Sequence, residues 1–451
     1  TTRASIYSQS TVFFTTLAIL AAFSVAPRGV YAAVSPPTAT TPTAAQQATV
    51  APTPDAWKRS HALNAGKSRF ATGKGLELNS DDGLFRLQLR PRAQMLYELT
   101  DSPGDGDTRE RSQAVSIRRA RFVASGHMWA QTTTFKMELA FSPGDLGMTD
   151  NKSGNPPITN RDNTVSRSPL LDFYVQFGQY RDFNVRVGQS KVPYSRQRVI
   201  SSGDLMLVDR AITNNEFNLD RDIGIDLRSQ DLFGLGGKLR YYLGVYAGEG
   251  HSSSDDNDFG MMYIGRVEAL PMGSFSDYSE SDQSRDSKAR LSIGAAYGLV
   301  QGAKGNKGIL GKRPADGGTT DTQNFAADAM FMQAGFSLQT EFYWRKGTRI
   351  AGSKTDKNDA LIAVESPRDG WGAMAQAGYL LPGTDVEIAG RYAQIRGGEG
   401  SSLNDGNEAG GGVNYYFASH ALKLQSDVFR LWSKTASDAS ISFRLQLQAA
   451  F

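Results

Sequence analysis

Cysteine is absent from the 451 residues of the chain, which excludes disulfide-stabilised folds and thiolate metal sites. An excess of charge of one sign is also missing. Because 49 Lys and Arg oppose 46 Asp and Glu, the chain lacks the basic surplus typical of nucleic-acid-binding proteins. Apart from one N-terminal stretch there is no long hydrophobic run, which excludes a bundle of membrane-spanning helices. The length allows several soluble domains or one large barrel, and 47 Gly with 17 Pro are too many for a mainly helical protein.

The single hydrophobic stretch lies at Thr11–Ala26, with Arg3 before it and small residues at Ala32 and Ala33 after it. A basic flank, a short apolar core and a small-residue exit are typical of a secretory signal peptide. A membrane anchor is the alternative, but about sixteen apolar-rich residues are short for a spanning helix. We therefore predict a signal peptide at residues 1–33 and export through the secretory pathway.

The next segment, residues 34–80, changes character without gaining periodicity. Up to about Pro54 it is rich in Pro, Ala and Thr and nearly free of charge, and residues 55–80 carry mixed charge. Neither composition can bury a core. We predict a disordered linker followed by a periplasmic lead-in.

Alternation of apolar and polar residues begins at residue 84 and continues to the C-terminus. In residues 84–99, for example, Phe85 and Leu87 alternate with Arg86 and Gln88. This pattern is typical of a strand with one apolar and one polar face, and about ten such residues cross a bilayer at a tilt. The segments with this pattern are residues 84–99, 117–130, 133–142, 170–179, 182–190, 222–230, 237–247, 260–270, 289–300, 324–334, 336–346, 370–381, 384–395, 410–418, 421–432 and 441–451.

The connections between these segments alternate between long and short. This alternation is typical of outer-membrane barrels, which have long external loops and short periplasmic turns. The connection at residues 271–288 is the main exception, since it is longer than its side predicts. A soluble β-sandwich is the alternative fold, because its strands also alternate. An export signal and a terminal Phe451 favour the membrane barrel.

Aromatic residues test the same model. Tyr97, Trp344 and Tyr379 share the apolar parity of their segments and fall near the predicted ends, where a barrel has aromatic girdles. Trp129 is the exception, with a predicted inward position. We therefore predict that residues 81–451 form an all-β, transmembrane antiparallel β-barrel of about 16 strands, a fold that leaves no unpaired edge in lipid.

The polar faces of the predicted strands carry about twice as many basic as acidic side chains, although the whole chain is nearly neutral. A basic wall raises the local anion concentration and lowers the barrier to anion transit. Pairing of these charges with carboxylates across strands, for stability alone, is the alternative. The predicted pore-lining cations include Arg86, Arg90, Arg92, Arg119, Arg121, Arg186, Arg228, Arg240 and Arg391.

Signals for an enzyme or a metal site are weak. Of the four histidines, only His127 lies well inside a predicted strand, and a polar wall residue is a better interpretation of it than a catalytic base. The run Asp255–Asp258 could hold calcium, but a solvated loop is favoured. We predict a non-enzymatic protein with no cofactor and no metal.

Several segments together resemble the phosphate-selective porin O and P family, over residues 83–451. They are, in order, Ser116–Phe122, Val185–Tyr194, Asp209–Arg210, Arg221–Ile225, Ser337–Tyr343, Ala377–Leu380, Ala389–Tyr392 and Gly412–Phe417. The resemblance implies a homotrimer of sixteen-stranded barrels, each with an inward-folded constriction loop. It also implies a ladder of arginines, matched here by Arg118, Arg119 and Arg121, that leads anions to a lysine-bearing narrow zone.

The segment at residues 191–221 has the right place for the inward loop, between the fifth and sixth predicted strands. Its constriction candidates are Lys191, Arg196, Arg198 and Arg210. Four acidic residues lie nearby and could equally pair with these cations, namely Asp204, Asp209, Glu216 and Asp220.

The resulting hypothesis is a passive, anion-preferring diffusion porin for phosphate or other small anions. It would lie in outer-membrane lipid of a Gram-negative-type bacterium and bind no nucleic acid. Two alternatives stay open. One is a structural or adhesive barrel with a plugged pore, and the other is a channel specific for an organic anion.

Overall fold

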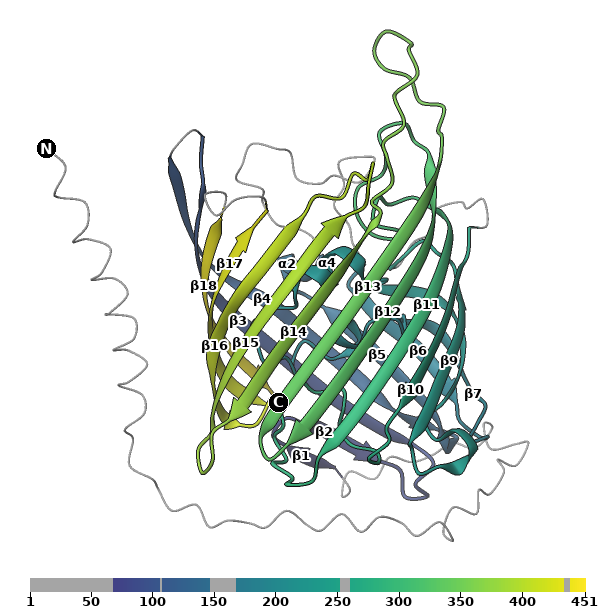
Figure 1. Cartoon of the computed structure of the whole chain (residues 1–451). Coiled ribbons are helices and arrows are strands. Elements are labelled where there is room, and N and C mark those ends of the chain that lie inside the picture. The colour runs from purple at the N-terminus through teal and green to yellow at the C-terminus, as the bar shows by residue number, and fades with distance from the viewer. Residues whose placement is uncertain (1–67, 106–107, 147–167, 252–259, 434–438) are drawn as a thin grey trace, which may run out of the picture. The chain divides into compact units, whose positions relative to one another are not determined.

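The computed structural model describes residues 68–105, 108–146, 168–251, 260–433 and 439–451. Sixteen strands, β3 to β18, pair antiparallel in sequence order, and β18 pairs with β3 to close the barrel (Figure 1). The predicted sixteen-stranded barrel is thus confirmed. Within the described residues, none of the helices is both long and apolar enough to cross a membrane. The predicted signal peptide, most of the linker and Asp255–Asp258 lie outside the described residues.

The strands follow the predicted segments closely. Their bounds are β3 (Arg86–Pro103), β4 (Arg109–Met128), β5 (Ala130–Ala140), β6 (Leu170–Phe177), β7 (Asn184–Lys191), β8 (Arg221–Ser229), β9 (Leu239–Tyr246), β10 (Met262–Ala269), β11 (Arg290–Ala303), β12 (Thr319–Gln333), β13 (Phe336–Ile350), β14 (Gly370–Leu380), β15 (Val386–Gly397), β16 (Gly406–Ala418), β17 (Leu422–Trp432) and β18 (Ser440–Ala450). Below, the end of the barrel that carries the short connections is called the short-turn end, and the opposite end the long-loop end.

A small hairpin precedes the barrel where periodicity predicts no strand. It consists of β1 (Arg69–Ala71) and β2 (Gly75–Asn79), and β2 pairs with the start of β3. Five residues are too few for alternation to stand out in the sequence. The tight turn between the strands uses Gly73 and Gly75 at φ of +73° and +72°, a conformation that glycine adopts at little cost. The last part of the predicted lead-in therefore belongs to the sheet.

The β3–β4 hairpin is also longer than the alternation predicts, since β3 continues to Pro103 and β4 starts at Arg109. Asp101 stabilises the hairpin tip by ion pairs with Arg109 and Arg111. Charged side chains in this stretch hide the strand signal, because both faces meet water.

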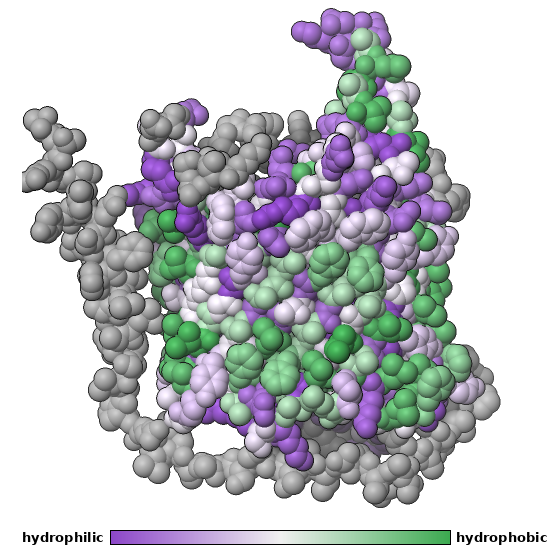
Figure 2. Space-filling model, in the orientation of Figure 1, coloured by the Kyte–Doolittle hydropathy of each residue, from purple (hydrophilic) through white to green (hydrophobic). Residues whose placement is uncertain are grey.

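The outer and inner faces of the strands differ as the alternation predicts. In β8, for example, Ile223 and Ile225 are exposed, whereas Asp222 and Asp226 are buried. Figure 2 shows the outcome on the face in view, a belt of hydrophobic residues with hydrophilic residues above it. Such a belt suits the hydrocarbon of a bilayer. Trp129 differs from its predicted inward position, because it occupies the turn between β4 and β5 at φ +62°.

The lumen is partly filled by the connection between β7 and β8, residues 192–220, which we call the inward loop. It contains the short helices α3 (Arg196–Val199) and α4 (Ile212–Phe217), and α4 contacts β13 to β16. Two further short helical segments, α2 (Pro143–Leu146) and η4 (Leu232–Gly234), lie in other connections. Buried apolar side chains of the inward loop, such as Val192 and Phe217, pack with inward residues of β9 to β13 and of β15.

Candidate pore and its lining

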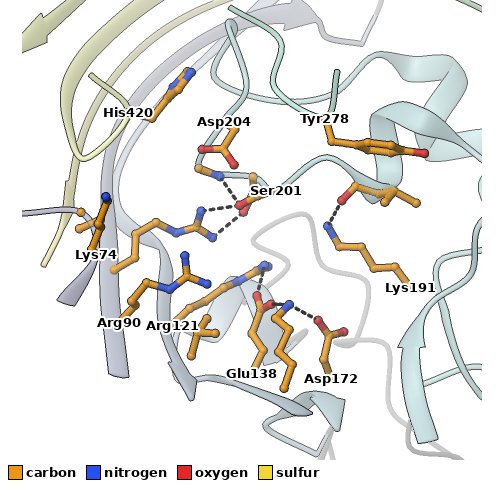
Figure 3. Close-up of a pocket in the computed structure, with 18 of the residues that line it drawn as sticks. Lys74, Arg90, Arg121, Glu138, Asp172, Lys191, Ser201, Asp204, Tyr278 and His420 are labelled. Carbon is orange, nitrogen blue, oxygen red and sulfur yellow. Dashed lines mark hydrogen bonds and ion pairs between the residues drawn. The ribbon is translucent and has the colours of Figure 1, made fainter. Parts of the chain in front are cut away.

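A cavity of about 710 Å³ runs between the inward loop and the inner face of β3 to β9. We call it the passage. It reaches Lys74 and Ala450 at the short-turn end, and Asp172 and Lys191 near the long-loop ends of β6 and β7. Figure 3 shows Arg90 and Arg121 on one side of it and Ser201 of the inward loop opposite. The passage therefore extends from the short-turn end to the long-loop ends of β6 and β7, while on β3 and β4 it contacts only residues near the short-turn end.

Basic residues dominate the lining of the passage. Its eight cations are Lys74, Arg90, Arg92, Arg121, Lys136, Arg186, Lys191 and Arg228, and its three acidic residues are Glu138, Asp172 and Asp204. This excess of basic over acidic side chains is larger than the excess predicted for the whole lumen wall. It follows the inward parity of β3, β4, β7 and β8.

Three of the lining cations are neutralised by carboxylates. Arg121 pairs with Glu138 at 2.9 Å and with Asp145 at 2.6 Å. Lys136 lies between Glu138, at 2.7 Å, and Asp172 (Figure 3). Arg228 pairs with Asp226. These contacts satisfy buried charges and favour a structural role for this part of the wall.

The other five lining cations have no carboxylate of a described residue within ion-pairing distance. Arg92 donates to the hydroxyls of Ser201 and Ser202 at 3.0 and 2.8 Å. Arg186 donates to the side-chain oxygen of Gln176 and stacks on Tyr174, and Lys191 donates to two loop carbonyls.

Arg90 has a buried Nε with no hydrogen-bond partner among the described residues, and Lys74 is exposed at the short-turn end. Asp204 is the one lining acid whose carboxylate pairs with no described cation. The unpaired charge of the passage is thus strongly positive.

The four constriction candidates take different positions. Lys191 lines the passage. Arg196 is fully buried and pairs with Asp328 at 2.5 Å and Asp277 at 2.8 Å. The other two are held within the inward loop, where Arg198 pairs with Asp220 and Arg210 donates to the carbonyls of Gln197 and Ile200.

The remaining predicted lining cations lie outside the passage and pair with acids. Arg86 pairs with Glu77, Arg240 with Asp277 and Glu268, and Arg391 with Glu408. Arg118 and Arg119 both contact the carboxylate of Asp209. Neighbouring residues of a strand normally point to opposite faces. Here the register of β4 against β3 shifts between Arg119 and Ile117, so that Arg118 is the extra residue of a bulge.

The inward loop is tied to the wall at several points. Asp209 meets β4 through Arg118 and Arg119, while the amide of Val208 donates to Asp427 of β17 at 3.0 Å. Burial raises the pKa of the Asp209 carboxyl, but Arg119 and Arg118 outweigh this effect and hold the pKa well below its usual value. In Asp220, burial also acts upward, and Arg198 and Arg221 lower the pKa to about 2.

We expect the ion pairs that hold the inward loop to persist on acidification from pH 7 to about pH 4. The pKa of Asp220 is lower in the folded chain than the ordinary 3.8. Its ion pair therefore stabilises the fold above that ordinary pKa, and the contribution is lost only as the pH falls through about 2. Counting spontaneous closures of single channels at both pH values tests this. More frequent closures at the lower pH would contradict it.

Some lining residues escape prediction from the sequence. Lys74 lies in the turn of the short hairpin, and Ser201 and Ser202 belong to the inward loop, where no periodicity exists. A serine pair beside an arginine-rich strand carries no signal until the loop is folded against it. Among the described residues, no cluster of three or more His, Asp or Glu side chains is arranged to hold a metal.

Comparison with known families decides the identity of the barrel. The family model described as phosphate-selective porin O and P matches residues 87–447. The chain belongs to this porin family. It is therefore a porin of the outer membrane of Gram-negative bacteria, and proteins of this family and fold are channels. No curated protein sequence matches the chain.

Solved structures similar to this porin include other outer-membrane proteins, and the first of those named here supports the fold. An anion-selective porin from Comamonas acidovorans is 13% identical, with a TM-score of 0.53, and the match covers 81% of this chain and 99% of that one. The trimer form of OmpT from Vibrio cholerae is 10% identical, with a TM-score of 0.48 and coverages of 81% and 99%. The outer membrane channel DcaP of Acinetobacter baumannii is 11% identical, with a TM-score of 0.48 and coverages of 83% and 99%.

Proposed function

We propose that this porin is a passive, anion-preferring channel through which phosphate-like solutes move down their gradients. One observation carries the proposal, namely the unpaired charge of the passage. Among the described residues, five lining cations have no carboxylate partner, whereas one lining acid, Asp204, has no cation partner. Weakly held cations along a water-filled path attract anions without trapping them, which conduction requires.

The arrangement of Arg92 favours oxyanions in particular. Its guanidinium donates to two serine hydroxyls, Ser201 and Ser202, and those hydroxyls can turn to donate to a passing oxyanion. A forked donor beside hydroxyls suits the oxygens of phosphate better than it suits chloride.

A second candidate is a channel for organic anions. Tyr174, Tyr242 and Tyr278 line the passage together with Arg186 and Arg228. Aromatic faces beside cations can hold an apolar body with a charged end. A plugged, structural barrel is less well supported, because the passage reaches from the short-turn end to the long-loop ends of β6 and β7.

Chloride conductance with added solutes separates these functions. The protein in a planar bilayer would receive phosphate, phthalate or gluconate at equal ionic strength. Reduction of the chloride current by phosphate supports the proposal. Reduction by phthalate alone supports the organic-anion channel, reduction by none contradicts an anion site, and absence of conductance supports the plugged barrel.

Two properties of the mature porin are part of the same proposal. We expect removal of residues 1–33 on export, with a linker between that site and the β1–β2 hairpin. We also expect assembly as a homotrimer in outer-membrane lipid. N-terminal sequencing and the mass of the detergent-solubilised assembly test these two expectations.

A further inference from the structure

The connection between β10 and β11 is unusual for the short-turn end of the barrel. It comprises residues 270–289, whereas the next longest connection at this end, between β8 and β9, comprises only residues 230–238. A turn of this size that projected into the periplasm would be exposed along its length. Its centre is instead buried, since Asp277, Glu280, Ser281 and Asp282 are 1–3% exposed.

Contacts with the wall show that this segment crosses the lumen. Near one side, Asp277 accepts from Arg240 of β9 at 3.0 Å and from Ser292 of β11 at 2.9 Å. On the far side, the Ser281 hydroxyl donates to Glu387 of β15 at 2.8 Å and lies 2.7 Å from the Tyr416 hydroxyl of β16. The segment therefore spans the lumen from β9–β11 to β15–β16.

The same segment supports the inward loop from below. Glu280 accepts from the amide of Met206 at 2.9 Å, and its own amide donates to the carbonyl of Asp204 at 3.0 Å. Asp277 accepts from Arg196 at 2.8 Å. Phe275 and Tyr278 of the segment also pack against a buried apolar cluster, formed by Ile200, Leu205, Met330 and Met332.

The carboxylates of this segment neutralise arginines in one half of the lumen. Asp277 neutralises Arg196 and Arg240, and Asp282 pairs with Arg290 at 2.7 Å. The unpaired lining cations lie on the opposite half, along the passage. Tyr278 faces the passage from the segment (Figure 3).

We propose that residues 270–289 form a second pore wall. This periplasmic segment closes the lumen between β10 and β16 beneath the inward loop, and it confines permeation to the basic passage, with Tyr278 as its residue facing the solute. The inference concerns the width and path of the pore, not its ion preference. Its tests therefore use conductance and size exclusion, which do not depend on the anion proposal.

Shortening the segment tests the proposal directly. In the full chain, residues 273–286 would be replaced by a two-residue turn, with barrel folding verified by heat-modifiable mobility on gels. We expect single-channel conductance to rise by about twofold, because a second path opens. Larger neutral polymers should also enter from the periplasmic side. A folded variant with unchanged conductance and polymer exclusion would overturn the proposal. Shortening the external loop at residues 351–369 is the matched control and should leave both unchanged.

A point probe tests the segment without altering its length. Because the chain contains no cysteine, Tyr278→Cys introduces a single thiol into the passage. Modification by a bulky, neutral methanethiosulfonate reagent should lower the single-channel current by about half, since it narrows the conducting path. Ser287→Cys, at an exposed position of the same segment, is the control and should react with little change in current. Labelling of Tyr278→Cys without a current change would contradict a position on the conducting path.

Discussion

Replacement of Arg92 and Arg186 by glutamine should lower the permeability ratio of chloride over potassium by about tenfold. Both side chains line the passage without a carboxylate partner among the described residues, so their charge acts on permeating ions. A unit charge about 4 Å away contributes about 1 kcal/mol even at the dielectric constant of water, and every 1.4 kcal/mol corresponds to a factor of ten. Reversal potentials of wild type and variant across a KCl gradient give the ratio.

The matched control changes the same number of charges away from the pore. Arg109 and Arg111 lie at the tip of the external β3–β4 hairpin, where they pair with Asp101. Their double replacement by glutamine should leave the reversal potential almost unchanged, because salt screens charges beyond about 10 Å. Equal effects of the two double variants would contradict a selectivity that originates in the passage.

The second large effect concerns the stability of the barrel. Arg196 is fully buried and holds Asp328 at 2.5 Å and Asp277 at 2.8 Å. In Arg196→Gln, buried carboxylates lose a cation that compensates them, which costs about 3–5 kcal/mol. The temperature at which the folded form disappears on gels should fall by roughly 10 °C.

A neighbouring arginine provides the control for this experiment. Arg198 belongs to the same helix α3, but its side chain is 22% exposed and its partner Asp220 also lies 3.7 Å from Arg221. Since partly exposed pairs contribute about 1 kcal/mol or less, Arg198→Gln should shift the temperature by only a few degrees. If both variants unfold at the wild-type temperature, the buried network does not stabilise the barrel.

The barrel follows from the sequence because every strand carries its own signal. Alternation such as that of Ile223 and Ile225 against Asp222 and Asp226 fixes which face meets lipid and which meets the lumen. The β1–β2 hairpin is missed because β2 has only five residues. The tip of the β3–β4 hairpin is missed because both of its faces meet water.

The site follows from the sequence only in part. The alternation of apolar and polar residues places Arg92, Arg186 and Arg240 inside the barrel. It does not predict which of these side chains lacks a carboxylate partner. Asp277, which neutralises Arg240, comes from a turn with no periodicity. Asp328, which holds Arg196, lies 132 residues away in the chain. Such long-range pairs form only when the inward loop and the β10–β11 segment fold into the lumen.

The sign of the reversal potential of the wild-type porin across a KCl gradient tests the central claim most directly. The unpaired cations of the passage predict a potential close to that of chloride, and neutralising the passage should move it toward zero. A potential directed toward that of potassium would contradict the claim. It would mean that acidic side chains, not the arginines and lysines of the passage, control which ions enter.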